Sequence, residues 1–450
     1  MLFSSLEFLF LFLPLTTVIY FLLPKRLKNF WLLVSGLCFY GFGEPKFLPV
    51  MMVTVAVDFV FGLCISRLKE KRRAVQTLLW LAVAYNVAQL AYFKFFAPEL
   101  PIGISFYTFQ ALSYVIDVYK RSVDACTSIV SFGAYVTLYP QLIAGPIVIY
   151  SDVDAELRQR KHSLSGVASG IRTFCAGLAK KVLLANTAGQ MWSFFAHSDG
   201  FADAYIGIFF FSMQIYFDFS GYSDMAVGLG RVFGFSFPQN FNYPYVSKSI
   251  TEFWRRWHIT LSSFFREYVY IPLGGNRGGS IKTYRNLLIT WALTGIWHGA
   301  TLNFLLWGLY FALILILEKA FLRKILYRLP RILQRIYAIF LIAIGWVIFA
   351  TDGDTLTLSE GGEYVLRLLG IGCSEIYSAL TGYELLRNLV FIVILILGST
   401  PLPRMLYQKM RERSGAALIV LDAILPIAAL VISVAYIVNS GYNPFLYFRF

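Results

Sequence analysis

The feature that most constrains this chain is a long series of apolar segments separated by short loops that carry lysine and arginine. A helix needs about 20 mostly apolar residues to cross a bilayer. The series therefore predicts an all-α, polytopic integral membrane protein. Several segments are shorter than a crossing, so we also expect re-entrant and interfacial helices. The apolar segments lie at residues 3–23, 30–42, 47–65, 74–93, 102–119, 129–149, 165–184, 204–219, 287–300, 301–317, 333–350, 385–399 and 416–438.

Composition agrees with a chain that lies in a membrane. Hydrophobic residues make up 58% of the sequence and charged residues only 14%, unlike a soluble globular domain. The net charge of +14 falls in short loops, where the positive-inside rule explains it better than nucleic-acid binding. We therefore expect the lipid bilayer, and no nucleic acid, as a partner. The five cysteines show no paired spacing, so we expect neither a disulfide framework nor a metal site.

Basic residues orient the chain, because cytoplasmic loops are enriched in lysine and arginine. Basic clusters follow the first and third apolar segments and recur at 323–335 and 404–413. These loops are predicted to be cytoplasmic, which leaves both termini extracytoplasmic. The acidic stretch 351–384 is predicted to be external.

Counting crossings adds a constraint on the middle of the chain. Counted from the N-terminus, residues 94–101 are predicted to lie outside the cell, whereas the basic residues of 151–163 indicate a cytoplasmic loop. One of segments 102–119 and 129–149 is therefore predicted to span the membrane and the other to re-enter. The total is about 12 crossings, or about 10 if residues 287–317 only dip into the bilayer.

His298 lies in a stretch, Asn286 to Leu317, that contains no Asp, Glu, Lys or Arg. We call this stretch the histidine hairpin, since both of its flanks are basic and its 32 residues are too few for the roughly 40 residues of two full crossings. The turn, near Thr294 to Ala300, is expected within the membrane. Gly295 and Gly299 would let another group approach closely.

An imidazole at that depth suggests a functional site. The alternative is a structural histidine that is hydrogen-bonded to a serine, a threonine or a backbone carbonyl in a helix interface. The glycines and the hairpin favour function. A neutral imidazole can take a proton from an attacking hydroxyl and return it to a leaving group, so His298 is the candidate general base.

A second candidate segment follows the capping box Ser249–Glu252. We expect one helix from there to Arg266. It has an apolar stripe, but its arginines argue against a position in the middle of the bilayer, so we expect it at the cytoplasmic interface or in a protein cavity. The alternative is an amphipathic packing helix. His258 is a second catalytic or an orienting group. The stripe consists of Phe253, Trp257, Leu261 and Phe264, and the arginines are Arg255, Arg256 and Arg266.

Two further motifs are candidates for binding. Four glycines surround Asn276 and Arg277, a pattern that can present backbone amides and a guanidinium to phosphate, although a flexible turn explains it as well. Gln214 and Asp218 share a helical face. A buried Asp218 needs a partner, for which Arg255 or Arg256 are candidates; the alternative is a structural ion pair.

The ordered set of motifs resembles the membrane-bound O-acyltransferase (MBOAT) superfamily over nearly the whole chain. The similarity is strongest to the bacterial branch that holds the alginate O-acetyltransferase membrane subunit and the D-alanyl-transfer protein of teichoic acids. The string at 271–277 is more similar to the alginate-type group. The motifs are Met1 to Phe10, Pro101 to Phe106, Pro140 to Pro146, the strings around Asp218, His258 and His298, and Asn443 to Phe448.

The resemblance implies one membrane domain over residues 1–450, with a central cavity. It divides the chain into N-terminal spans (1–219), a cytoplasmic or interfacial loop (220–286), the hairpin (287–317) and C-terminal spans (318–450). His298 matches the essential histidine of the family and His258 the second one. The substrate-binding candidates are Trp297, Asp218, Gln214, Trp254, Arg255, Arg256, Asn276 and Arg277. Asn303 departs from the bulkier or aromatic residue expected at its position.

The implied activity is O-acyl transfer. We expect acetyl groups to be moved across a bacterial plasma membrane for O-acetylation of an exported or cell-wall polysaccharide, as in alginate biosynthesis. No bound cofactor is expected; the acyl donor would be a co-substrate, either acetyl-CoA or an acyl carrier protein. The expected partner is an extracytoplasmic acyltransferase or acyl-accepting carrier. The alternatives are D-alanyl transfer to teichoic acid and a non-catalytic transporter.

Overall fold

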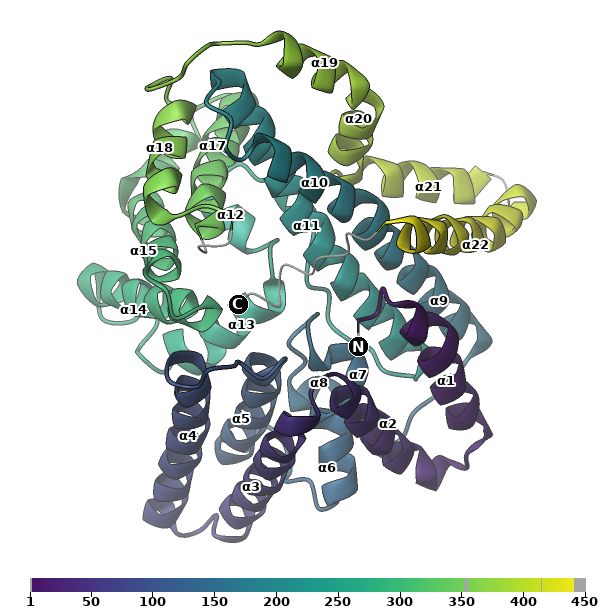
Figure 1. Cartoon of the computed structure of the whole chain (residues 1–450). Coiled ribbons are helices and arrows are strands. Elements are labelled where there is room, and N and C mark those ends of the chain that lie inside the picture. The colour runs from purple at the N-terminus through teal and green to yellow at the C-terminus, as the bar shows by residue number, and fades with distance from the viewer. Residues whose placement is uncertain (1, 352–354, 414, 441–450) are drawn as a thin grey trace. The chain divides into compact units, whose positions relative to one another are not determined.

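The computed structural model describes residues 2–351, 355–413 and 415–440 (Figure 1). All regular secondary structure in these ranges is helical, which confirms the predicted all-α class. The longer helices are α1 (Leu13–Leu22), α2 (Lys28–Gly43), α3 (Leu48–Arg67), α4 (Arg72–Phe95), α5 (Ile104–Lys120), α8 (Tyr150–Arg158), α9 (Leu164–Ala179), α10 (Asn186–Phe195), α11 (Phe201–Val232), α14 (Ser280–His298), α15 (Leu302–Leu317), α17 (Arg331–Ala350), α18 (Leu358–Leu368), α19 (Ala379–Arg387), α20 (Leu389–Gly398), α21 (Leu402–Arg413) and α22 (Gly415–Asn439).

Several of these helices can cross a membrane. Within the described ranges, five helices are long and apolar enough, and a sixth crossing is possible if α19 and α20, which meet at 62°, form one broken span. A multi-pass membrane protein is therefore confirmed. The predicted total of about 10 to 12 crossings, the orientation of the termini and the central cavity remain predictions. The five helices are Pro45–Arg67, Arg72–Phe95, Leu302–Leu326, Arg331–Ala350 and Val420–Asn439.

The chain divides into two compact units. Of the described residues, one unit comprises 2–178, 221–239 and 429–440, and the other comprises 179–220, 240–351, 355–413 and 415–428. We refer to them as the first and the second unit. All of the candidate site residues belong to the second unit.

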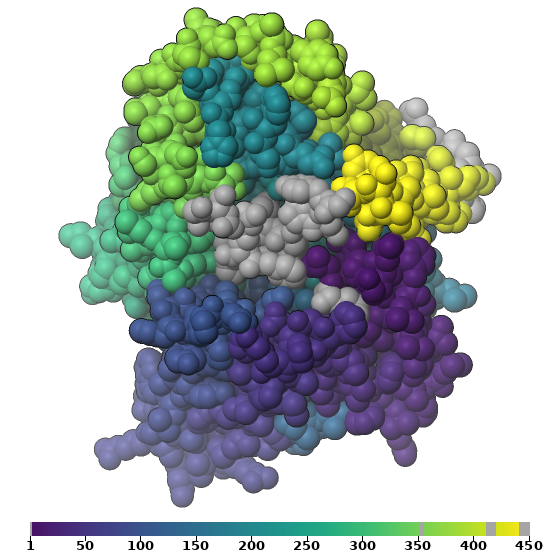
Figure 2. Space-filling view, viewed as in Figure 1, coloured from purple at the N-terminus to yellow at the C-terminus, as the bar shows by residue number. Residues whose placement is uncertain are grey.

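In the first unit, α5 packs against α3 and α4 and is almost entirely buried. Polar side chains join α3 to α4: Asn86 donates a hydrogen bond of 2.8 Å to Asp58, and the amide of Gln89 donates one of 2.9 Å to Thr54. Large apolar side chains of α4 are exposed, among them Trp80 (69%), Leu81 (53%) and Val87 (54%). Figure 2 shows one face of the molecule, viewed as in Figure 1. A buried polar seam with an apolar outer face is the arrangement expected of packed helices in lipid.

The segment 129–149 does not form one helix. It contains α6 (Ile129–Val136) and the single turn α7 (Tyr139–Leu142), and its last seven residues have no helical structure. At 17 residues, α5 is about 25 Å long. Of the two segments between which the sequence left the choice open, α5 alone has a length near that of a crossing.

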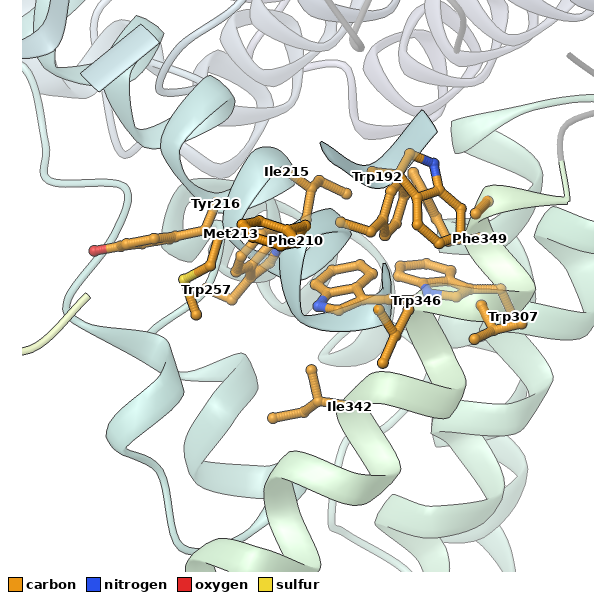
Figure 3. Close-up of a cluster of buried hydrophobic side chains, with 14 of the residues drawn as sticks. Trp192, Phe210, Met213, Ile215, Tyr216, Trp257, Trp307, Ile342, Trp346 and Phe349 are labelled. Carbon is orange, nitrogen blue, oxygen red and sulfur yellow. The ribbon is translucent and has the colours of Figure 1, made fainter. Parts of the chain in front are cut away.

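The second unit is organised around the histidine hairpin. α14 packs on α15, α15 on α17, and α17 on α18, while the short helix α12 (Ile250–Trp254) touches both α15 and α17. Their facing sides form a continuous aromatic core, in which Figure 3 shows Trp307, Trp346 and Phe349 together. This core surrounds His298.

Candidate active site

His298 is the last residue of α14, and α15 begins at Leu302. The three residues between them reverse the chain, so α14 and α15 form a helical hairpin, whose turn starts later than Thr294. Its position within the membrane stays a prediction. The C-terminal end of a helix carries partial negative charge. An imidazolium that forms on His298 when it accepts a proton is therefore stabilised by its position.

Glycines bring the two arms of the hairpin into close contact. A Cβ on Gly295 would lie 2.3 Å from the carbonyl oxygen of Phe304, and one on Gly308 would lie 2.3 Å from the carbonyl oxygen of Trp291. A Cβ on Gly299 would lie 2.2 Å from the Phe304 ring. The close approach predicted from Gly295 and Gly299 is therefore present, and Phe304 is the group that approaches.

Replacing Gly295 with alanine is expected to destabilise the protein by about 1–3 kcal/mol, the usual cost of overpacking, because the added methyl group meets backbone that cannot move aside. The matched control is Gly362→Ala. That position is also helical, and a Cβ there would have no neighbour within 4 Å. Thermal unfolding in detergent measures both. A Gly295 variant as stable as the control would show that the hairpin tolerates wider spacing.

Aromatic rings enclose His298, which is 7% exposed. The ring centroids of Trp297 and Trp307 both lie 4.9 Å from that of His298, and that of Phe349 lies 5.4 Å away. Trp307 and Phe349 meet His298 edge to face, at 81° and 82°. These contacts hold the imidazole in a fixed orientation and keep bulk water from it.

His258 corrects the prediction of one continuous helix from Ser249 to Arg266. α12 ends at Trp254, α13 spans Ile259–Phe265, and His258 between them has φ 44° and ψ 56°. This left-handed conformation is costly for a residue with a side chain and is typical of functional sites. The predicted apolar stripe is nevertheless buried on both sides of the break.

Hydrogen bonds define the tautomer of His258. Asn240 Oδ1 accepts bonds from the Thr260 backbone N–H (3.3 Å) and hydroxyl (2.9 Å), and lies 3.1 Å from His258 Nδ1. Because the backbone N–H can only donate, this atom of Asn240 is the oxygen. Neutral His258 therefore carries its proton on Nδ1 and its lone pair on Nε2.

The two histidines share one neighbour. The ring centroid of Trp297 lies 6.3 Å from that of His258 and 4.9 Å from that of His298. Burial lowers the pKa of His258, and the positive charge that His298 can carry lowers it further. His258 is therefore neutral near pH 7, as a base or an orienting group requires.

Asp218 is buried with a different partner from those predicted. Its carboxylate lies 2.9 Å from Lys181 Nζ, and both side chains are at most 5% exposed; Lys181 also donates to Asn186 Oδ1 at 2.8 Å. Neither candidate arginine is in this ion pair, because Arg255 is exposed and Arg256 pairs with Glu252, four residues before it. The overlooked signal was a lysine within the apolar segment 165–184.

Gln214 and Asp218 lie one turn apart on α11, as predicted, and both are buried. Trp254 is buried in the aromatic core, with its ring centroid 5.5 Å from that of Trp307. Phe219, the residue after Asp218, meets His258 edge to face at 4.6 Å. The second unit therefore brings α11, α12 and the hairpin together around the two histidines.

Comparison with known proteins identifies the family. The sequence model of the membrane-bound O-acyltransferase family, MBOAT, matches residues 69–352. The chain belongs to the MBOAT family. It is an O-acyltransferase, as the resemblance implied, and His298, His258 and Trp297 all lie within the matched range.

Several relatives of this acyltransferase have described activities. It is 41% identical to a probable alginate O-acetylase of Azotobacter vinelandii over 78% of this chain and 75% of that protein. It is 33% identical to a peptidoglycan O-acetyltransferase of Helicobacter pylori, over 78% and 77% respectively. A teichoic acid D-alanyltransferase of Streptococcus thermophilus is more distant, with 26% identity over 50% of this chain and 58% of that protein.

The glycine-rich turn at residues 274–279 has no contact with the aromatic rings that enclose His298 among the contacts described above. Asn276 and Arg277 are exposed, and the side-chain oxygen Oδ1 of Asn276 accepts hydrogen bonds from Tyr270 and Lys319. All four glycines have positive φ, as this motif requires: Gly274, Gly275, Gly278 and Gly279. The structure therefore does not bring Asn276 and Arg277 into contact with the histidines.

Glu318 is a buried carboxylate next to the site that the sequence does not point to. It follows α15 and is 1% exposed. Its carboxylate accepts bonds from the backbone N–H groups of Ile250 (2.7 Å) and Thr251 (2.9 Å) and from the Thr251 hydroxyl (2.5 Å). A carboxylate at a helix N-terminus is stabilising. Glu318 thereby fixes α12, which precedes His258, to the end of the histidine hairpin.

Proposed function

We propose that this acyltransferase transfers acetyl groups to hydroxyls of an exported or cell-wall polysaccharide. The observation that carries the proposal is the buried pair His258 and His298, whose rings both neighbour the ring of Trp297. The substrate assignment is supported by the relatives that act on alginate and peptidoglycan, which match most of this chain. The D-alanyltransferase matches only half of it.

In the proposed reaction, His298 removes the proton of the acceptor hydroxyl while the hydroxyl oxygen attacks the carbonyl carbon of an acyl thioester. The C=O electron pair moves to oxygen in the tetrahedral intermediate. When the carbonyl re-forms, the C–S bond breaks and the thiolate takes the proton from His298. The products are an O-acetyl ester and a free thiol, and the imidazole is neutral again.

The other site residues have supporting roles in this proposal. His258 orients the acceptor or passes on its proton, Trp297 forms the wall between the histidines, and Gln214 and Trp254 contact substrate. Asp218, held by Lys181, fixes α11 against His258. Arg255, Arg256, Asn276 and Arg277 would bind the phosphates of the donor from the cytoplasmic side, since guanidinium groups and backbone amides suit phosphate.

The donor and the partner follow from the proposed orientation. With both termini extracytoplasmic, the basic loops face a cytoplasmic thioester, either acetyl-CoA or an acylated carrier protein. The acetyl group would leave on the other face, to an extracytoplasmic acyltransferase or acyl-accepting carrier that serves the polysaccharide. The proposed location is the plasma membrane of a bacterium.

The test is mass spectrometry of the cell envelope and exported polymer from a deletion strain of the source organism. We expect O-acetyl esters to be lost and to return when the gene is restored, while D-alanine esters stay constant. Loss of D-alanine esters alone would replace acetyl transfer with D-alanyl transfer. An unchanged content of both esters would refute acyl transfer to an envelope polymer.

A further inference from the structure

Several buried N–H donors of the second unit have no hydrogen-bond acceptor among the described residues, and three of them lie on side chains near one another. They are Nε1 of Trp307, Nε1 of Trp254 and Nδ2 of Asn303. Their side chains are 1%, 7% and 3% exposed, respectively. A buried donor without a partner costs about 1–3 kcal/mol, so a group of three requires an explanation.

One of the donors, Trp307, contacts His298, and the other two lie on side chains next to Trp307 in space or along α15. Trp307 meets the His298 ring edge to face at 4.9 Å, and the Trp254 ring lies 5.5 Å from that of Trp307. Asn303 precedes Trp307 by one turn on α15, so the two share a helical face. The side-chain oxygen Oδ1 of Asn303 accepts a hydrogen bond from the Thr301 hydroxyl at 2.5 Å. This bond fixes the side-chain amide and leaves its NH₂ group available to a ligand.

The chemistry of the set selects its ligand. Indole and amide N–H groups only donate, so they fit a ligand oxygen that accepts several bonds and carries negative charge. Weak N–H to ring contacts are second-order. The rings of Trp254 and Trp307 meet edge to face at 85°, so an N–H to ring contact could partly satisfy one of the two indoles. No such contact explains the unpaired NH₂ group of Asn303.

We propose that Trp307 and Asn303, assisted by Trp254, bind the carbonyl oxygen of the acyl thioester and stabilise the oxyanion formed on it. This inference rests on the proposed function and adds two catalytic residues to it. When the acceptor oxygen bonds to the acyl carbon, the C=O electron pair becomes the charge on this oxygen. The N–H groups hold that charge until the carbonyl re-forms and the C–S bond breaks, while His298 carries the proton.

Preorganised donors of this kind act mainly on the transition state, where the charge is greatest. Removing one such donor lowers the rate by about 100- to 1,000-fold in enzymes that use an oxyanion hole. The family resemblance led us to expect a bulkier or aromatic residue at position 303. The asparagine found there adds an N–H donor that an aromatic hydrocarbon ring would not supply.

The experiment replaces Trp307 with 3-benzothienylalanine, which keeps the bicyclic shape and removes only the N–H. Trp307→Phe and Asn303→Leu are made alongside it, with Trp291→Phe as matched control, because Trp291 belongs to the same aromatic cluster and is partly exposed. Each variant is expressed in the deletion strain. The initial rate of polymer O-acetylation, measured by NMR, is divided by the amount of folded protein in the membrane.

We expect the benzothienyl variant and Asn303→Leu each to lower the rate about 100-fold, while the Trp291 variant stays near the wild-type rate. A benzothienyl variant as active as wild type would refute the role of Trp307. A benzothienyl variant that lost no more activity than the Trp291 variant would refute it as well. If the wild-type gene itself restored no O-acetyl ester, the proposed function would fail and this inference with it.

Discussion

Replacing His298 with alanine is expected to abolish acyl transfer and to leave a folded, membrane-inserted protein. General acid–base catalysis contributes about 10²- to 10⁴-fold. The rings that pack against His298, those of Trp297, Phe304, Trp307 and Phe349, cannot take over its proton transfer. The measurement is the rate of O-acetyl ester formation in the deletion strain, normalised to the amount of protein in the membrane.

Two further variants make the interpretation of that loss specific. His298→Gln keeps a polar side chain of similar reach but cannot shuttle a proton at neutral pH, so it should be as inactive as alanine. His197→Ala is the matched control, because His197 is exposed and in no proposed role. Acyl transfer by the purified alanine variant at more than about a hundredth of the wild-type rate would show that His298 is not the general base.

The histidine hairpin was predictable because its evidence is local. An uncharged stretch with basic flanks and a length short of two crossings defines a hairpin, and the glycines at 295 and 299 indicate where its arms touch. The family motifs then indicate the role of His298. The structure adds what the sequence does not contain, namely which rings enclose the imidazole: Trp307 from the other arm and Phe349 from α17.

The region around His258 was predicted less well because its geometry depends on distant partners. An amphipathic pattern through residues 249–266 favours one helix, yet the chain breaks at His258, where Asn240 holds both the imidazole and Thr260. The capping oxygen of Ser249 was predicted correctly. The start of α12 is also capped by the carboxylate of Glu318, which lies far from it in the sequence.

Asp218 illustrates the same limit. Arg255 and Arg256 were reasonable partners for Asp218 by residue type alone. Pairing is decided by which cation can be buried along with the carboxylate. Lys181 lies in a π-helical turn between α9 and α10, and its compact ammonium group reaches Asp218 at 2.9 Å, whereas Arg255 remains at the surface.

Removing Lys181 alone is expected to destabilise the protein strongly. Lys181→Met keeps the length of the side chain but leaves the Asp218 carboxylate buried without its lysine. Breaking a buried ion pair in this way typically costs about 3–5 kcal/mol. Unfolding of the purified protein in detergent, followed by denaturant or heat, measures the loss. The control is Arg256→Met, which breaks the half-exposed pair with Glu252 and should cost about 0.3–0.5 kcal/mol.

The double variant Lys181→Met with Asp218→Leu separates stability from function. Apolar replacement of both members of a buried pair is often neutral or stabilising, so the double variant should regain most of the stability that the single variant loses. If Asp218 also fixes α11 and Phe219 against His258, acyl transfer should remain low in the double variant although the protein is stable. Recovery of both properties would make the pair purely structural, and a double variant as unstable as Lys181→Met would show that the site needs the charges to fold. Only the combination of restored stability and lost transfer supports a positioning role for Asp218 in catalysis.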